Sequence, residues 1–187
     1  KELTGLNDWI FDVSITANRP DCQSIFGLAR EVAAALGQPL KTPALDYTET
    51  EVEKEGFDVI VEAQDLCPRY IAHYVYDVKL GQSPAWMRRR LALVGNNSIS
   101  NIVDITNYIM RELGQPLHAF DCDYLEGNAI QVRRANEGEK IVTLDEKEFT
   151  LNPSNLVICD GKKPVALAGI MGGLNSEIRD TTTEVMF

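Results

Sequence analysis

Histidine and cysteine are the residues of this chain best suited to metal binding and acid–base chemistry, and both are scarce. The four cysteines lie far apart and form no Cys-x-x-Cys pair: Cys22, Cys67, Cys122 and Cys159. Only two histidines are present, His73 and His118. A structural zinc site needs four such ligands, usually in closely spaced pairs. The sequence therefore predicts no metal site, and the unpaired cysteines favour a reduced, cytoplasmic protein.

Basic side chains form one run, of three arginines at residues 88–90. Successive side chains on a helix point in different directions, so this run does not make a single patch. The formal net charge of -10 also argues against a broad surface for nucleic-acid backbone, which requires clustered cations. We expect any RNA contact to be local, and we favour a solvated helix face over a phosphate clamp for the three arginines.

Three stretches have the apolar spacing of amphipathic helices, namely residues 22–36, 84–94 and 102–113. The residues predicted to cap them are Asp21, Ser83 and Asn101. Gly37 and Gly114 follow two of the helices as stop signals. Thr106 falls on the apolar face of the third helix.

Period-two alternation and turn signals predict strands over residues 9–15, 59–62, 70–78, 129–133, 140–144, 148–151, 156–159 and 165–170. The last residues, 185–187, also look like a strand. His73 lies in an alternating run, which favours a half-buried strand histidine over a catalytic one. Since the helices mostly precede a β-rich half, we predict an α+β fold with helices packed on a β-rich layer.

The composition is that of a globular protein of 187 residues, with 44% hydrophobic and 25% charged residues. No apolar stretch approaches the roughly 20 residues of a membrane span, and the first residues lack the apolar core of a signal peptide. Residues 41–56 are acidic and lack a period, so we predict a linker there. The strand-like end at residue 187 suggests a piece excised from a longer chain.

Three segments carry a resemblance to a known family. The first holds the Asn-Arg-Pro-Asp turn at residues 18–21, and the second runs from Asn-Ile-Val-Asp-Ile-Thr-Asn to Leu-His-Ala-Phe-Asp over residues 101–121. The third is Ala-Leu-Ala-Gly-Ile-Met-Gly-Gly at residues 166–173. Together they resemble the β subunit of bacterial-type phenylalanyl-tRNA synthetase, within its B3/B4 editing domain. Ala17 and Glu146 depart from the family, at positions where proline and glycine are usual; Glu146 suggests a different local turn.

The resemblance implies three divisions: a strand-turn-helix at residues 1–40, the acidic linker at 41–56, and the B3/B4 main body at 57–187, truncated at its C-terminus. It implies a parent ligase that joins phenylalanine to tRNA-Phe with ATP and Mg²⁺, and a domain that hydrolyses mischarged tyrosyl-tRNA-Phe. The expected partners are the 3′ end of that tRNA and the synthetase α subunit, with no DNA and no membrane. The piece itself would need no cofactor and would lack the aminoacylation site.

By the same resemblance, His118 is the expected catalytic residue, and Thr106, Asn107 and Gly172 are expected to bind substrate. Each has a simpler alternative. Thr106 could bond back within its helix, Asn107 could be a structural or solvated amide, and His118 could fix its loop through backbone carbonyls. Glycines 169, 172 and 173 could admit a ligand or serve turn geometry. Whether His118 acts as a base, orients water or holds the ribose stays open.

The resemblance also places a glutamate and a threonine-x-alanine element of the tyrosine pocket beyond residue 187. We therefore expect this piece to fold at least in part but to edit poorly. A non-catalytic module that positions tRNA or packs against another subunit is the alternative, and a free-standing relative of the domain is a third hypothesis.

Overall fold

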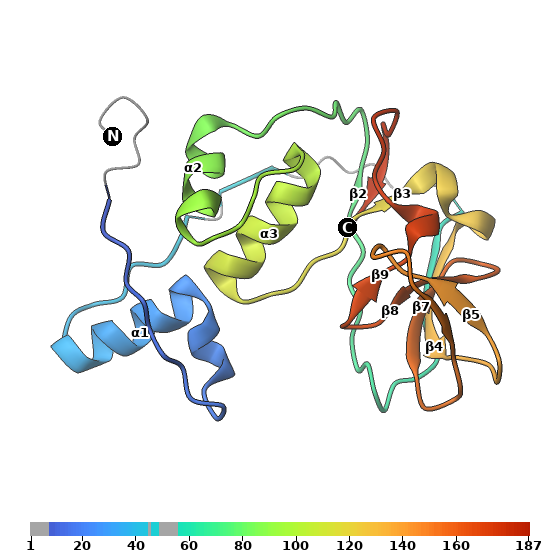
Figure 1. Cartoon of the computed structure of the whole chain (residues 1–187), viewed down its shortest axis with the longest axis horizontal. Coiled ribbons are helices and arrows are strands. Elements are labelled where there is room, and N and C mark those ends of the chain that lie inside the picture. Colours follow the sequence, from blue (N-terminus) through green and yellow to red (C-terminus); the bar gives the residue numbers. More distant parts are fainter. Residues whose placement is uncertain (1–7, 45, 49–55) are drawn as a thin grey trace. The chain divides into compact units, whose positions relative to one another are not determined.

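The computed structural model describes residues 8–44, 46–48 and 56–187, and the chain divides into two compact units (Figure 1). The helical unit consists of residues 1–51 and 81–117, and the strand unit consists of residues 52–80 and 118–187. Each unit is thus built from two separate stretches of chain. This division differs from the predicted boundaries at residues 40 and 56, because the helices within residues 81–117 join the N-terminal stretch.

The first long helix, α1 (Ile25–Leu36), follows a short 3-10 helix, η1 (Pro20–Gln23). Its cap is Ser24, whose hydroxyl accepts a hydrogen bond from the Gly27 amide at 3.0 Å, so the prediction of Asp21 as the cap was wrong. Asp21 is instead an ion-pair partner of Arg19. Gly37 ends the helix as predicted, with a φ of 61° in the left-handed region that glycine adopts readily.

Helices α2 (Ala85–Leu93) and α3 (Asn101–Leu113) pack together in the helical unit. Ser100 caps α3, not Asn101, and its hydroxyl accepts from the Val103 amide. Ser83 makes no capping bond to α2, contrary to prediction. Its hydroxyl donates to the buried carboxylate of Asp104 on α3 at 2.5 Å, so this serine links the two helices.

The described residues of the strand unit form three small sheets. The largest has the strand order β1 (Asp58–Val61), β4 (Ala129–Arg134), β7 (Leu156–Cys159), β8 (Pro164–Leu167) and β9 (Met171–Gly172). β1 is parallel to β4, and the other neighbours are antiparallel. A second sheet has the order β2 (Tyr74–Val75), β10 (Val185–Met186) and β3 (Phe120–Asp121), and the third pairs β5 (Lys140–Val142) with β6 (Glu148–Thr150).

The main core of the strand unit joins the first two sheets. Phe120 of β3 and Met186 of β10 pack with Ile130, Val132 and Val165 of the larger sheet. These side chains are buried, and every residue of β3, β8 and β10 is buried with them. A second cluster, around Val157, Ile141 and Leu151, lies against β5 and β7. Burial of the two clusters fixes the register of short strands that would be unstable alone.

The α+β class is confirmed, and most predicted strands match observed ones to within two or three residues at each end. The prediction of a strand over residues 9–15 was wrong: this stretch forms no strand and pairs with none of the described residues. The run at 70–78 shortens to β2, and the end at 185–186 is β10. Residues 45 and 49–55 of the predicted linker lie outside the described residues, and the rest of it forms no helix or strand.

Among the described residues, no helix is both long enough and apolar enough to cross a membrane.

Candidate functional site

His118 lies against the glycine-rich strand β9. A Cβ atom placed on Gly172 would come within 2.2 Å of His118 Cε1 and 2.5 Å of its Nε2, closer than any side chain can approach. Leu144 lies on the same side, with its Cδ1 at 3.1 Å from that position. Gly172 therefore has a role the sequence did not suggest, since its bare backbone makes room for the imidazole of His118.

The His118 ring also packs edge-on against Phe120, with 4.7 Å between ring centroids and 72° between planes. Phe120 is fully buried in β3, so one side of the imidazole contacts a residue of the core. Burial lowers the pKa of His118 below its ordinary value, because desolvation disfavours the charged imidazolium. The side chain is therefore neutral at neutral pH and can accept a proton.

Nε2 of His118 is buried and forms no hydrogen bond with any described residue. Buried polar atoms are nearly always paired, so an unpaired one needs an explanation such as a ligand or a catalytic role. This observation disfavours the alternative in which this nitrogen anchors the loop to a backbone carbonyl.

The other two glycines of the segment serve different purposes. A Cβ on Gly173 would meet the Val165 carbonyl oxygen and Asn175 Oδ1 at 2.7 Å, so its bare backbone permits close packing on β8. Gly169 has open space around it and a φ of 70°, which indicates turn geometry between β8 and β9. Of the three, Gly172 alone is tied to His118.

Thr106 and Asn107 are neighbours on α3, in the helical unit, and both are half-buried. The Thr106 hydroxyl donates to the Val103 carbonyl at 2.8 Å, which is the back-bond expected of a helical threonine without a ligand. The hydroxyl can still accept a hydrogen bond. The four predicted site residues thus form two local pairs, Thr106 with Asn107 on one helix and His118 with Gly172 in the strand unit.

One group of possible metal ligands occurs among the described residues, formed by Asp21, Cys22 and Glu31. The guanidinium of Arg19 already occupies it, donating to Asp21 at 2.8 Å and to Glu31 at 2.5 Å. Hydrogen bonds from Arg19 lower the pKa of Asp21 to about 2 and also lower that of Glu31. The cluster is therefore an ion-pair network in which Arg19 already engages both carboxylates, and a metal ion would have to displace this guanidinium. It accounts for the Asn-Arg-Pro-Asp turn as a structural motif.

Comparison with known proteins gives the family. The B3/4 domain model matches residues 66–187, which is well over half of the chain. The chain belongs to the B3/4 domain family. This match covers His118, Gly172, Thr106 and Asn107, and the strand unit from β2 onward.

The predicted resemblance to the phenylalanyl-tRNA synthetase β subunit is also confirmed. The chain is 54% identical over 99% of its length to the phenylalanine–tRNA ligase beta subunit of Syntrophus aciditrophicus, and 52% identical to that of Geobacter sulfurreducens. It spans only 23% of the length of these relatives. An N-terminal fragment of the phenylalanyl-tRNA synthetase beta subunit from Pyrococcus horikoshii shares the fold, with 18% identity and a TM-score of 0.53 over 99% of this chain and 60% of that one.

Two neighbours of His118 were not singled out from the sequence. Phe120 lies within the family segment but was given no role, and Leu144 was not considered. Phe120 could have been found, since it lies two residues from His118 and on the same side of an extended stretch. Leu144 is far along the chain, and no sequence signal links it to the histidine.

Proposed function

We propose that this B3/4 domain hydrolyses tyrosyl-tRNA-Phe, as the editing module of a phenylalanyl-tRNA synthetase β subunit. The observation that carries the proposal is His118, a neutral histidine with a buried, unpaired Nε2 held over a bare glycine. Similarity to ligase β subunits over 99% of this chain supports the tRNA ester as substrate.

In the proposed reaction, a water molecule attacks the ester carbonyl that joins tyrosine to the tRNA 3′ end. Nε2 of His118 accepts a proton from the attacking water and returns it to the ribose oxygen as the ester bond breaks, so that the tRNA leaves with a free 3′-terminal hydroxyl and tyrosine leaves with its carboxyl group. A general base of this kind accelerates a reaction by about 10²- to 10⁴-fold. Gly172 positions the base, because any larger residue would push the imidazole aside.

Thr106 and Asn107 are the proposed substrate-binding groups on α3. Discrimination between tyrosine and phenylalanine depends on one hydroxyl, and a buried polar group left unpaired by phenylalanine costs on the order of 1 to 3 kcal/mol. The Thr106 oxygen, which already donates to Val103, would act as an acceptor. We propose that further pocket groups come from the longer subunit, so that this chain alone edits poorly.

The test is deacylation of tyrosyl-tRNA-Phe and phenylalanyl-tRNA-Phe by this chain and by the full-length subunit, each with His118→Ala. His73→Ala is the matched control, since it removes the other histidine, an exposed one on the edge of the second sheet. We expect tyrosine-selective hydrolysis by the full-length protein, a loss of about 10²-fold or more with His118→Ala, and no loss with His73→Ala.

Hydrolysis that survives His118→Ala would rule out this histidine as the base. A full-length protein that binds tRNA or the α subunit but hydrolyses neither ester would support the alternative, a non-catalytic positioning or interface module. For the complete synthetase, we propose a cytoplasmic ligase that uses ATP and Mg²⁺ with the α subunit, at sites outside these 187 residues.

A further inference from the structure

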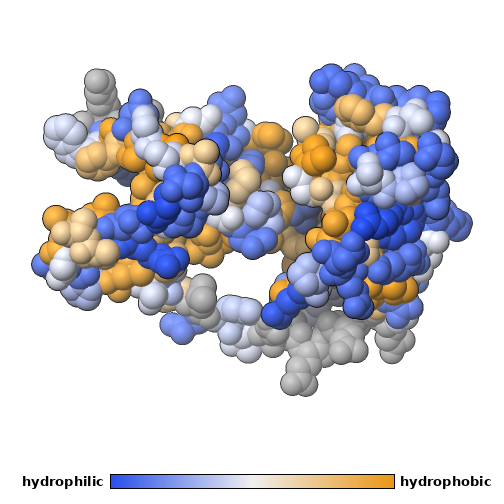
Figure 2. Space-filling model, turned by 90° about the horizontal axis from the view of Figure 1, so that it is seen from below, coloured by the Kyte–Doolittle hydropathy of each residue, from blue (hydrophilic) through white to orange (hydrophobic). Residues whose placement is uncertain are grey.

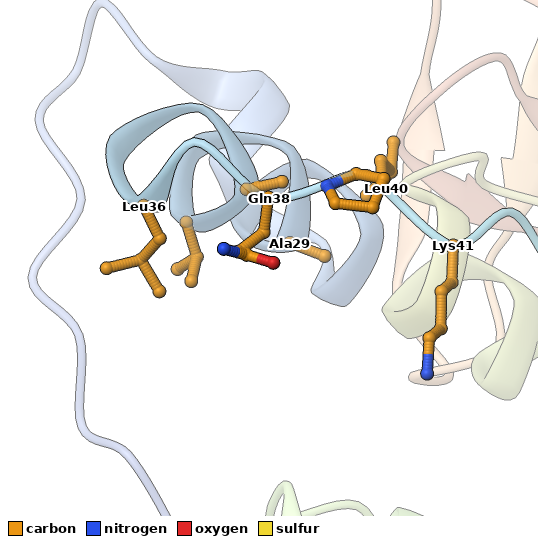
Figure 3. A pocket seen from close by; sticks show the side chains of 8 residues that line it. Ala29, Leu36, Gln38, Leu40 and Lys41 are labelled. Carbon is orange, nitrogen blue, oxygen red and sulfur yellow. The ribbon is translucent and has the colours of Figure 1, made fainter.

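Two hollows on the surface of the helical unit differ in their chemistry. The one drawn in Figure 3 follows α1 and the chain after it, and Lys41 is the only charged residue among the described ones that line it. The second has a volume of about 380 Å³ and is lined by Ile25 of α1 together with residues of α2, its C-terminal end and α3. Three charged residues line this second hollow, namely Arg90, Arg111 and Glu112. We call it the arginine groove, and Figure 2 shows hydrophilic and hydrophobic surface side by side on this unit.

The arginine run at residues 88–90 contributes one side chain to the groove. Arg89 forms an ion pair with Asp8 at 3.0 Å, and Arg88 is exposed and does not line the groove. Arg90 does line it, and so does Arg111 from the next helix. The fold therefore brings together two arginines that are far apart in the sequence.

Arg90 is held in place by aromatic neighbours. Its guanidinium carbon lies 5.6 Å from the centre of the Trp86 ring and 6.0 Å from that of Tyr108. Nη1 of Arg90 donates to the Tyr108 hydroxyl, which in turn donates to the Glu112 carboxylate at 3.1 Å. A guanidinium carries five N–H donors, so this one bond orients the group and leaves most donors for a ligand.

Arg111 supplies the second cation. It is exposed, and among the described residues its only hydrogen bond joins Nε to Asn96 Oδ1 at 2.8 Å. The apolar part of the lining includes the buried Leu91 and the exposed Ile25 and Val94. Guanidinium groups beside apolar and aromatic surface suit a ligand that joins a phosphate to a flat base, as a nucleotide does.

The charge of the surrounding sequence has the sign that such a ligand needs. Residues 81–117 contain four arginines and no lysine, against one aspartate and one glutamate, in a chain whose net charge is -10. Most of the protein therefore repels a polyanion, and this stretch attracts it.

We propose that the arginine groove binds an unpaired nucleotide of the tRNA, with its phosphate on Arg90 and Arg111 and its base against Leu91, Val94 and Ile25. The identity of the RNA rests on the proposed function. The groove volume lies within the usual range of ligand sites, and proteins bind RNA largely through unpaired nucleotides. An acidic peptide is the competing occupant. Glu112 disfavours it, because this carboxylate can accept a hydrogen bond from a ribose hydroxyl or a base amino group but repels a further carboxylate.

The test measures the binding of uncharged tRNA-Phe, at a series of salt concentrations, by the synthetase assembled from the α subunit and the full-length β subunit. Arg90→Gln and Arg111→Gln should each raise the Kd about threefold or more at low salt. Each should also lower the slope of log K against log salt by about 0.7, the loss of one phosphate contact on a single strand. Arg88→Gln is the matched control, since it removes the same charge from α2 outside the groove, and it should leave the slope unchanged.

A second pair of variants tests the apolar lining. Val94→Glu places a carboxylate in the groove, and Ala92→Glu makes the same change in charge at an exposed position of α2 outside it. We expect Val94→Glu to weaken tRNA binding by a larger factor than Ala92→Glu.

Unchanged slopes in Arg90→Gln and Arg111→Gln would overturn the proposal. Equal losses in these two variants and in Arg88→Gln would also overturn it, because overall charge and not the groove would then attract the tRNA. Uncharged tRNA contains no ester, so binding is measured apart from hydrolysis. A negative result leaves the proposed role of His118 standing, and groove-dependent binding without hydrolysis would support the groove and contradict the editing reaction.

Discussion

Position 172 shows how a single residue can be determined by a neighbour far away in the sequence. The bare backbone of Gly172 faces the imidazole of His118, and Gly172 is in β9, where any residue could adopt the backbone conformation. The requirement for glycine is therefore steric. It comes from one side chain, so removing that side chain should remove the requirement.

We expect Gly172→Ala to lower the unfolding free energy by about 1 to 3 kcal/mol, because the new methyl group overlaps the His118 ring. In a His118→Ala background the same change should cost much less. Denaturant unfolding of the four proteins of this double-mutant cycle measures the coupling, which we expect to exceed about 1 kcal/mol. Gly169→Ala is the control, since its cost comes from a φ of 70° and should not depend on His118. Additive effects at 172 and 118 would contradict the contact.

The pKa of His118 predicts a pH dependence with a definite sign. Burial lowers the folded-state pKa below the unfolded value of about 6.5. Below that pH the unfolded chain binds more protons than the folded one, so stability should fall as the pH drops from about 6.5 through the folded pKa. We expect His118→Gln to flatten this part of the profile. Parallel profiles of unfolding free energy for the two proteins between pH 8 and pH 5 would exclude the buried, neutral histidine.

Glu146 occupies a conformation that suits glycine better. Its φ is 61°, in a turn where its amide donates to the Thr143 carbonyl at 2.8 Å. Residue 146 therefore adopts the left-handed conformation that glycine favours. Glutamate at a position where the family usually has glycine thus strains the backbone there. A left-handed non-glycine residue costs roughly 1 to 2 kcal/mol.

We expect Glu146→Gly to raise the unfolding free energy by up to about 1 kcal/mol, after the entropy of the new glycine is deducted. Glu146→Ala keeps the strain and removes only the charge, so it should leave the stability nearly unchanged. Thermal and denaturant unfolding of both variants provide the measurement. A stabilisation of equal size in the alanine variant would show that charge, and not φ, limits this turn.

At the scale of elements, a buried carboxylate holds two helices together. Asp104 of α3 accepts hydrogen bonds from Ser83 at 2.5 Å, from Ser98 at 2.5 Å and from the Ile99 amide at 2.8 Å. Burial alone would raise the pKa of Asp104, but these hydrogen bonds outweigh it and hold the pKa below the usual value. The loop between α2 and α3 and the start of α2 are thereby tied to α3.

We expect Asp104→Ala to destabilise the protein by about 3 kcal/mol, because it leaves two hydroxyls and an amide without their acceptor. Asp12→Ala, which removes an exposed carboxylate from the same unit, should change stability by less than about 0.5 kcal/mol. Urea unfolding followed by the helical circular dichroism signal measures both. A small effect of Asp104→Ala would show that water replaces the carboxylate and that the link is dispensable.

The sequence predicts helices and strands well where the signal lies in neighbouring residues, and poorly where it depends on tertiary contacts. The helix stops at Gly37 and Gly114 depend on one residue's conformation and were predicted correctly. The caps were misassigned by one to three residues, because several capping residues precede each helix and only packing selects among them. The strand predicted at residues 9–15 does not form, because period-two alternation alone cannot supply the neighbouring strand that a sheet requires, and none of the described residues provides one. β3 and β9 have two residues each, too few for a period.

The candidate site shows the same limit. Nothing in the spacing of His118 and Gly172 indicates contact. Only the family resemblance predicted both as site residues. The structure places them together, while Thr106 and Asn107 lie in the other unit. Sequence periodicity does not reveal which side chains meet through sheet pairing, because the pairing joins segments far apart in sequence.

At the scale of the whole chain, the second sheet explains why the helices interrupt the strand unit. β2 and β3 both pair antiparallel with β10, so they run parallel to each other on either side of it. Parallel strands cannot be joined by a tight turn and need a crossover connection. The stretch between β2 and β3 is that connection, and it carries α2 and α3. The strand unit should therefore need a crossover of sufficient length, and not these particular helices.

This reasoning predicts that the strand unit folds without residues 81–117 when a Gly-Ser linker of about ten residues replaces them. β2 and β3 are two strand spacings apart, about 10 Å, and a flexible linker of that length spans about 15 to 20 Å. We expect one cooperative urea transition and the loss of most of the α-helical circular dichroism signal. The same protein with Phe120→Ala should lose cooperativity, because Phe120 is fully buried in the core shared by both sheets. If the linker protein showed no cooperative transition, the strand unit would depend on the helical unit for its stability, and the crossover would be a folding partner as well as a connection.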